Sequence, residues 1–110
     1  MLAITKTAAL SGIEGVEVTV EADSERGLPS FHIIGLGDTA VKESSERVRG
    51  AILNSGFEYP RGRITVSLSP AWIHKKGSHY DLAVAVGILA SQTILHQKSL
   101  EERAFIGELT

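Results

Sequence analysis

The feature that most constrains this fold is the run at residues 82–90, which contains no charged or polar side chain. A helix that is apolar on every side has no face to present to water, so it must lie inside a domain. The run is far shorter than the roughly 20 residues that a membrane-spanning helix needs. It therefore predicts a core helix with Leu82, Val86 and Leu89 buried, and no membrane partner.

Length and composition place the chain among single globular domains. Its 110 residues are enough for one hydrophobic core and too few for two, so we expect one domain over residues 1–110. There is no cysteine, which excludes a disulfide framework and a thiolate metal site. The first residues lack the apolar segment and cleavage site of a signal peptide. We expect a cytoplasmic protein.

Alternating apolar and polar residues predict the strands. The pattern is present at residues 3–8, 16–21, 31–34 and 64–68. Glycines within residues 11–15 predict a turn that joins the first two strands into an antiparallel hairpin. Residues 105–109 predict a last strand. A strand at the very end of a chain has nothing beyond it to hold it, so we expect a fragment of a longer protein.

The helices are predicted by steps of three and four between apolar or small residues. One such pattern runs from Asp38 to residue 55, with Asp38 as the expected cap and Gly56 just beyond the end. Ser78 and Asp81 have the spacing of a capping box before the core helix. The order β-β-β-α-β-α-β then predicts an α+β layer sandwich, a mixed sheet with helices on one face.

Basic residues are concentrated in the middle third of a chain whose net charge is -2. Residues 41–80 hold seven basic and three acidic side chains, a balance of +4. An anionic partner would meet this third of the chain, although basic side chains also decorate ordinary solvated faces. The basic residues are Lys42, Arg47, Arg49, Arg61, Arg63, Lys75 and Lys76.

Several segments share their order and spacing with a known family. They are residues 34–44, 46–49, 54–57, 64–71, 76–78, 81–83 and 105–109. Together they resemble the N-terminal domain of the ComM/YifB family of magnesium-chelatase-like AAA+ ATPases, over essentially the whole chain. The resemblance implies a ribosomal-S5-domain-2-like fold, as in Lon protease and the RadA recombination factor. One departure is Gly37, where the family more often has proline.

The resemblance also implies a function. It suggests a non-catalytic front domain that aids DNA contact or hexamer assembly in a helicase for branch migration during natural transformation. The ATPase motor, with its ATP and magnesium, is expected after residue 110. Because G-x-x-x-x-G-K-[ST] is absent, we expect no cofactor and no catalysis in this chain. The seven basic residues become candidates for weak, non-specific phosphate contacts with DNA.

Two enzymatic alternatives find less support in the sequence. In a Lon-like serine-lysine peptidase, alignment of the loop would put His79 rather than Ser78 at the nucleophile, with the partner lysine beyond Thr110. The G-x-G-x-x-A pattern from Gly35 resembles a dinucleotide fingerprint. However, Asp38 would repel a pyrophosphate there, so we interpret the pattern as a tight turn.

Three further hypotheses concern binding without catalysis. The four histidines have no zinc-motif spacing, so we expect no metal site. Trp72 lies near the Lys75-Lys76 pair and could stack on an unpaired base, but packing beneath its loop is the commoner role of such a residue. The chain could also be a purely structural docking domain, whose mark would be a large exposed apolar patch.

Overall fold

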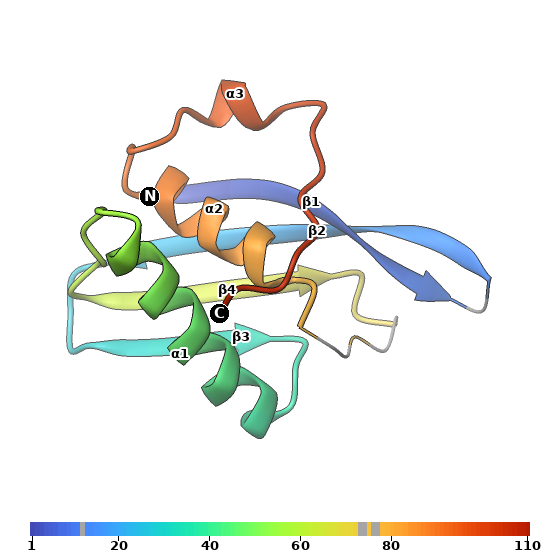
Figure 1. The fold of residues 1–110 in the computed structure, drawn as a ribbon, viewed down its shortest axis with the longest axis horizontal. Helices are drawn as coiled ribbons and strands as arrows, with labels where there is room; N and C mark the ends of the chain where they lie inside the picture. The colour runs from blue at the N-terminus through green and yellow to red at the C-terminus, as the bar shows by residue number, and fades with distance from the viewer. Residues whose placement is uncertain (12, 73–74, 76–77) are drawn as a thin grey trace.

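A four-stranded mixed sheet carries both long helices on one face (Figure 1). The computed structural model describes residues 1–11, 13–72, 75 and 78–110. This arrangement confirms the predicted α+β class. The sheet has the order β1-β2-β4-β3. The elements are β1 (Leu2–Ser11), β2 (Glu14–Glu25), β3 (Ser30–Ile34), α1 (Asp38–Asn54), β4 (Arg63–Ser69), α2 (Asp81–Ser91) and α3 (Gln97–Leu100).

The alternation of side chains sets the two faces of the sheet. In β2, Val18, Val20 and Ala22 are buried under the helices, while Glu21 between them is exposed. β1 and β2 pair antiparallel, which confirms the predicted hairpin. β4 then lies between two partners, antiparallel to β2 and parallel to β3. No helix of the described residues covers the opposite face, which is largely polar and carries Glu21, Asp23, Thr65 and Ser67.

The connection from β3 through α1 to β4 has an uncommon hand. In Figure 1 the two parallel strands run to the right, α1 returns in front of them, and β4 lies above β3. This geometry makes the crossover left-handed, whereas about 98% of such connections are right-handed. The left-handed unit places α1 beside α2 on the same face of the sheet.

The core helix α2 is buried as its composition predicts, but its most buried residues differ from those expected. Val84 and Ile88 are 0% exposed, and Leu89 is 9% exposed. Leu82 and Val86 are only half-buried, so the prediction was wrong for these two. The reason is that α2 packs on the sheet along one side, while its opposite side, which carries Leu82 and Val86, is only partly covered by the rest of the chain. Val86 packs against the small cluster that contains Leu100.

Gly87 allows α2 to approach the sheet closely. A Cβ atom at this position would lie 3.1 Å from the Cβ of Ala22 in β2 and 3.7 Å from the side chain of Thr5 in β1. Thr5 also donates its hydroxyl proton to the carbonyl oxygen of Ala83, at 2.9 Å. The helix is thus attached to the first two strands by a close contact and a buried hydrogen bond.

The helix ends confirm one expected cap and correct two. Gly56 follows α1 with φ +86, as a C′ glycine should. Gly37 rather than Asp38 is the N-cap of α1, and Asp38 is its first residue. The capping box at Ser78 was also wrong, because Tyr80 is the N-cap of α2 and no side chain caps it.

Residues 105–109 do not form the predicted last strand. Their hydrogen bonds go to different parts of the chain: Phe105 N donates to Lys6 O at 2.8 Å, and Gly107 N donates to His79 O at 3.0 Å. Gly107 O in turn accepts from Leu82 N at 3.1 Å. Bonds to a strand, a loop and a helix cannot make a ladder, so the segment is extended without belonging to the sheet.

The short helix α3, which the sequence pattern did not predict, closes the edge of β1. The side chain of Gln97 accepts from Ile4 N through Oε1 and donates to Ile4 O through Nε2, both at 2.7 Å. An amide side chain therefore takes the place that a neighbouring strand would occupy.

Candidate functional site

The predicted basic residues that the structure describes, six of the seven, do not lie on one face. Lys42 lies in the first turns of α1, and Lys75 follows the carboxyl end of β4. Arg49, Arg61 and Arg63 lie at the opposite end of the molecule, where α1 ends and β4 begins. Lys75 is only 5% exposed, and its Nζ donates to the carbonyl oxygen of Pro70. Lys76 lies outside the described residues.

Arg47 is held by a buried carboxylate instead of facing solvent. Its Nε lies 2.6 Å from Asp81 Oδ2, and its Nη2 lies 3.2 Å from Oδ1. Asp81 also accepts from the Ser44 hydroxyl at 3.0 Å and from Leu109 N at 3.3 Å. The hydrogen bond to Asp81 raises the pKa of Arg47. The Asp81 carboxylate thus joins α1, α2 and the final segment, and it neutralises the charge of Arg47 within the fold.

Arg49 and Arg61 line two adjoining hollows at the amino end of β4. The larger has a volume of about 850 Å³ and includes Arg49 and Tyr59 in its lining. The smaller has a volume of about 250 Å³ and includes Arg26. We call the two together the arginine hollow. The residues that line both parts are Pro60, Arg61, Gly62 and Gln92.

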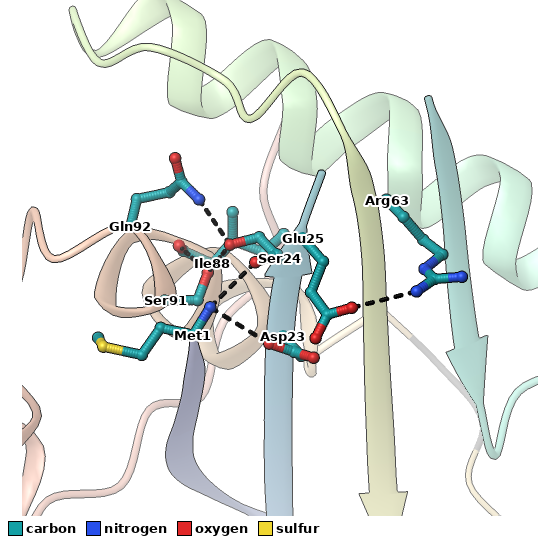
Figure 2. Close-up of polar contacts among 8 residues, drawn as sticks. All are labelled: Met1, Asp23, Ser24, Glu25, Arg63, Ile88, Ser91 and Gln92. Carbon is teal, nitrogen blue, oxygen red and sulfur yellow. Dashed lines mark hydrogen bonds and ion pairs between the residues drawn. The ribbon is translucent and has the colours of Figure 1, made fainter. Parts of the chain in front are cut away.

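The charge of the arginine hollow is dominated by guanidinium groups without an acidic partner. Within the described part of the chain, no ion pair involves Arg26, Arg49 or Arg61. Arg63 differs, because its Nη2 lies 3.1 Å from Glu25 Oε2 (Figure 2). Glu58 is an opposing charge in the lining of the larger part. Glu25 also lines the smaller part, but it is paired with Arg63. Three arginines without an ion pair therefore face one such carboxylate, Glu58, and the site is positive.

Arg26 was missed by the sequence argument because it belongs to the acidic first third of the chain. It directly follows β2, and β2 pairs antiparallel with β4, ending on the pair Glu25↔Arg63. Antiparallel pairing brings the end of one strand to the start of the other, so Arg26 comes beside Arg61. The sequence does place a basic residue beside each strand, Arg26 after β2 and Arg61 before β4. The two can be assigned to one site only once the pairing of β2 with β4 is known.

Gly62 makes the close approach of these two segments possible. A Cβ atom at residue 62 would lie 1.9 Å from the carbonyl oxygen of Glu25, far inside any permitted contact. Only glycine therefore fits without a shift of the backbone. The contact fixes the spacing between the loop that carries Arg61 and the end of β2 that carries Arg26.

Arg49 lies over the ring of Tyr59, which gives the larger part of the hollow a flat wall. The guanidinium carbon is 5.8 Å from the ring centroid, a cation–π distance. Burial raises the pKa of Tyr59 to about 12, and the charge of Arg49 acts in the opposite direction. The phenol is neutral at physiological pH, so it adds no negative charge to the site.

The structure also bears on the stacking, metal-binding and membrane hypotheses. Trp72 is 74% exposed, so the interpretation that it packs beneath its loop was wrong. It follows the carboxyl end of β4, away from the arginine hollow. Among the described residues, no three or more His, Asp or Glu side chains come together as metal ligands. In the same part of the chain, no helix has the length and hydropathy to cross a membrane.

The peptidase hypothesis requires a serine hydroxyl beside a lysine amine. Lys75 Nζ near this loop donates to the Pro70 carbonyl oxygen. Ser78 presents its carbonyl oxygen to Asp81 N at 3.1 Å. His79 Nε2 lies 3.0 Å from Ala8 O on β1. These contacts attach Ser78 to the start of α2 and His79 to β1.

Comparison with known proteins gives consistent matches. Residues 20–110 match the family described as "Subunit ChlI of Mg-chelatase". Over 108 residues the chain is 44% identical to the uncharacterized protein YifB of Escherichia coli (strain K12) and 42% identical to the competence protein ComM of Haemophilus influenzae. Each alignment covers 98% of this chain and 21% of the relative. The chain therefore spans about a fifth of the length of these relatives.

Proposed function

Because this chain belongs to the family of the ChlI subunit of magnesium chelatase, we propose that it is a non-catalytic front domain that holds DNA for an AAA+ ATPase motor. The chain covers 21% of YifB and of ComM, which leaves most of each relative for such a motor. ATP, magnesium, helicase activity and a hexameric ring then belong to the longer parent protein. One relative, ComM, is named a competence protein.

The observation that carries this proposal is the gathering of Arg26, Arg49 and Arg61 around one hollow. A protein with a net charge of -2 attracts a polyanion only where its positive groups are collected and unpaired. Such groups neutralise phosphates and fix the position of the nucleic acid, without reading its sequence. We expect binding in the ordinary non-specific range, with a Kd of roughly 10⁻⁴ to 10⁻⁶ M. A ring of such domains would raise the effective affinity by avidity.

The proposal includes the finer ribosomal-S5-domain-2-like fold. The antiparallel β1–β2 hairpin, the parallel pair β3–β4 and the placement of α1 and α2 on one face support it. A second candidate function, docking against another domain or subunit, is favoured by the uncovered face of the sheet. Leu2 and Ile34 are 55% and 61% exposed there, on β1 and β3.

The test is a titration of labelled single-stranded DNA with the 110-residue chain at several salt concentrations. Three phosphate contacts predict a slope of log Kd against log salt of about 2, since each contact contributes about 0.7 on single strands. The double variant Arg26→Ala/Arg61→Ala should weaken binding and lower the slope by about 1.4.

A control for the loss of positive charge elsewhere is Arg103→Ala, which removes one exposed charge that does not line the arginine hollow. This variant should leave the slope almost unchanged. Undetectable binding at low salt, or equal losses in the control and the Arg26→Ala/Arg61→Ala variant, would refute the DNA contact and favour docking.

A further inference from the structure

We propose that the arginine hollow takes an unpaired nucleotide and that Gln92 pairs with the edge of its base. The inference rests on the proposed DNA contact and narrows it to single strands. Its basis is a chain of hydrogen bonds that fixes the side-chain amide of Gln92 at the border between the two parts of the hollow (Figure 2).

The chain of hydrogen bonds begins at the carbonyl oxygen of Ile88. The Ser91 hydroxyl donates to this oxygen at 2.6 Å. A hydroxyl has one proton, so Ser91 Oγ can only accept in its contact with Ser24 Oγ at 2.9 Å. The proton of Ser24 is thereby used as well. Ser24 has to accept from its other neighbour, which is Gln92 Nε2 at 2.5 Å.

This proton count determines the orientation of the Gln92 amide. Its nitrogen faces Ser24, and its Oε1 points away from the network (Figure 2). The two serines are 8% and 3% exposed, so the anchor lies in the interior while the amide itself is exposed. Within the described residues, no hydrogen bond is made by Oε1 of Gln92. The outer edge of the amide therefore offers an acceptor and a second N–H donor side by side.

Such an edge complements an unpaired base of any kind. Every base has one donor and one acceptor next to each other on its pairing edge: N6–H and N1 in adenine, N4–H and N3 in cytosine, N3–H and O4 in thymine, N1–H and O6 in guanine. In a duplex the opposite strand occupies these groups. Recognition on this edge is a property of single-stranded nucleic acid. Gln92 therefore favours single strands and tolerates all sequences.

The other walls of the hollow suit the rest of a nucleotide. Arg26 and Arg61 lie where a backbone phosphate can be neutralised. Arg49 lies over the Tyr59 ring, and both residues line the larger part, where a base can stack on them. The volume of about 850 Å³ is within the range of small-ligand sites, roughly 300–1,000 Å³.

The experiment compares three labelled probes of equal length: oligo-dT, an oligonucleotide of abasic sites, and a duplex. All present phosphates, but only oligo-dT presents free base edges. The wild-type chain should bind oligo-dT about fivefold or more tightly than the abasic probe, the size of a modest base contact. Gln92→Met keeps a side chain of similar size and removes the amide. It should reduce that preference to the part that base stacking supplies and leave abasic binding unchanged.

Two further measurements test whether Gln92→Met lowers the preference for bases only indirectly, by disturbing the fold. Oligo-N3-methylthymidine has no N3–H donor but can still stack, so wild-type protein should bind it as Gln92→Met binds oligo-dT. Ser24→Ala should release the amide and lose part of the preference. Equal binding of oligo-dT and the abasic probe, with dependence on Arg61 intact, would overturn this inference and leave the proposed function standing. Failure of all the probes to bind at low salt would overturn both.

Discussion

At the scale of single residues, two ion pairs of the same chemistry have different surroundings. The side chains of Arg47 and Asp81 are 26% and 2% exposed, and the pair joins two helices. The side chains of Arg63 and Glu25 are 56% and 54% exposed, and the pair joins neighbouring strands. Removing one member of a buried pair leaves the other charge without compensation, whereas water solvates the survivor of an exposed pair.

The two pairs therefore predict unequal losses of stability. Arg47→Met should lower the free energy of unfolding by about 3–5 kcal/mol, because the Asp81 carboxylate stays buried. The matched change Arg63→Met should cost less than about 1 kcal/mol. Urea denaturation followed by circular dichroism measures both. Similar losses for the two variants would show that Asp81 is hydrated, contrary to its burial.

Tyr59 predicts a loss of stability in alkali. Its pKa is raised by burial to about 12, from 10.0 for an exposed phenol. The folded state prefers the neutral phenol, so this contribution is complete below pH 10 and is lost as the pH rises toward 12. We expect at most roughly 2 kcal/mol, measured as the unfolding free energy at pH 9 and pH 11.5. Tyr59→Phe should have a flatter profile. Tyr80, whose pKa burial also raises, is present in both proteins and cancels in the comparison.

At the scale of elements, the local patterns in the sequence were reliable and the contacts between distant segments were not. The hairpin, α1, β4 and α2 follow from alternation or helical spacing within a few residues. The segment at 105–109 has a strand-like composition, but its neighbours are β1, a loop and the start of α2. Arg26 and Gln92 were missed because strand pairing and helix packing bring them to the site.

The flat packing of α2 on the sheet predicts which positions matter most. Ile88→Ala should cost about 2–5 kcal/mol, because Ile88 is 0% exposed and its neighbours cannot fill the space. Val86→Ala should cost no more than about 1 kcal/mol, since Val86 is half-buried near α3. Thermal or urea denaturation gives the two values. If Val86→Ala proved the more damaging, α2 would be rotated about its axis relative to this description.

At the scale of the whole molecule, the two edges of the sheet differ in the hydrogen bonds that their backbones make. The outer edge of β1 is occupied by Gln97, Phe105 and His79, which bind the backbone of Ile4, Lys6 and Ala8. Within the described part of the chain, no such partners are found along the outer edge of β3. An open edge is available for pairing with another strand. The protein therefore presents one closed and one open side to its neighbours.

Hydrogen exchange should report the closed edge directly. Ile4 N donates to Gln97 Oε1 at 2.7 Å, so its amide proton should exchange slowly for a residue in an edge strand. Gln97→Ala should raise the exchange rate of this proton by about tenfold or more, because the bond is worth about 1.5 kcal/mol. The amide of Val20 in β2 should be unaffected. An unchanged rate at Ile4 would mean that the Gln97 contact is transient.

The position of β4 between β2 and β3 has a consequence for how the chain acquires its structure. The hairpin of β1 and β2 can form as soon as both strands exist. β3 and α1 come next along the chain, yet β3 pairs with β4 alone and has no earlier partner. Pairing β2 with β4 closes a loop of about 40 residues. The entropic cost of closing a loop grows only slowly with its length, so this cost is modest. During synthesis, β3 must therefore remain unpaired until β4 has emerged, and the addition of β4 completes the sheet on both sides at once.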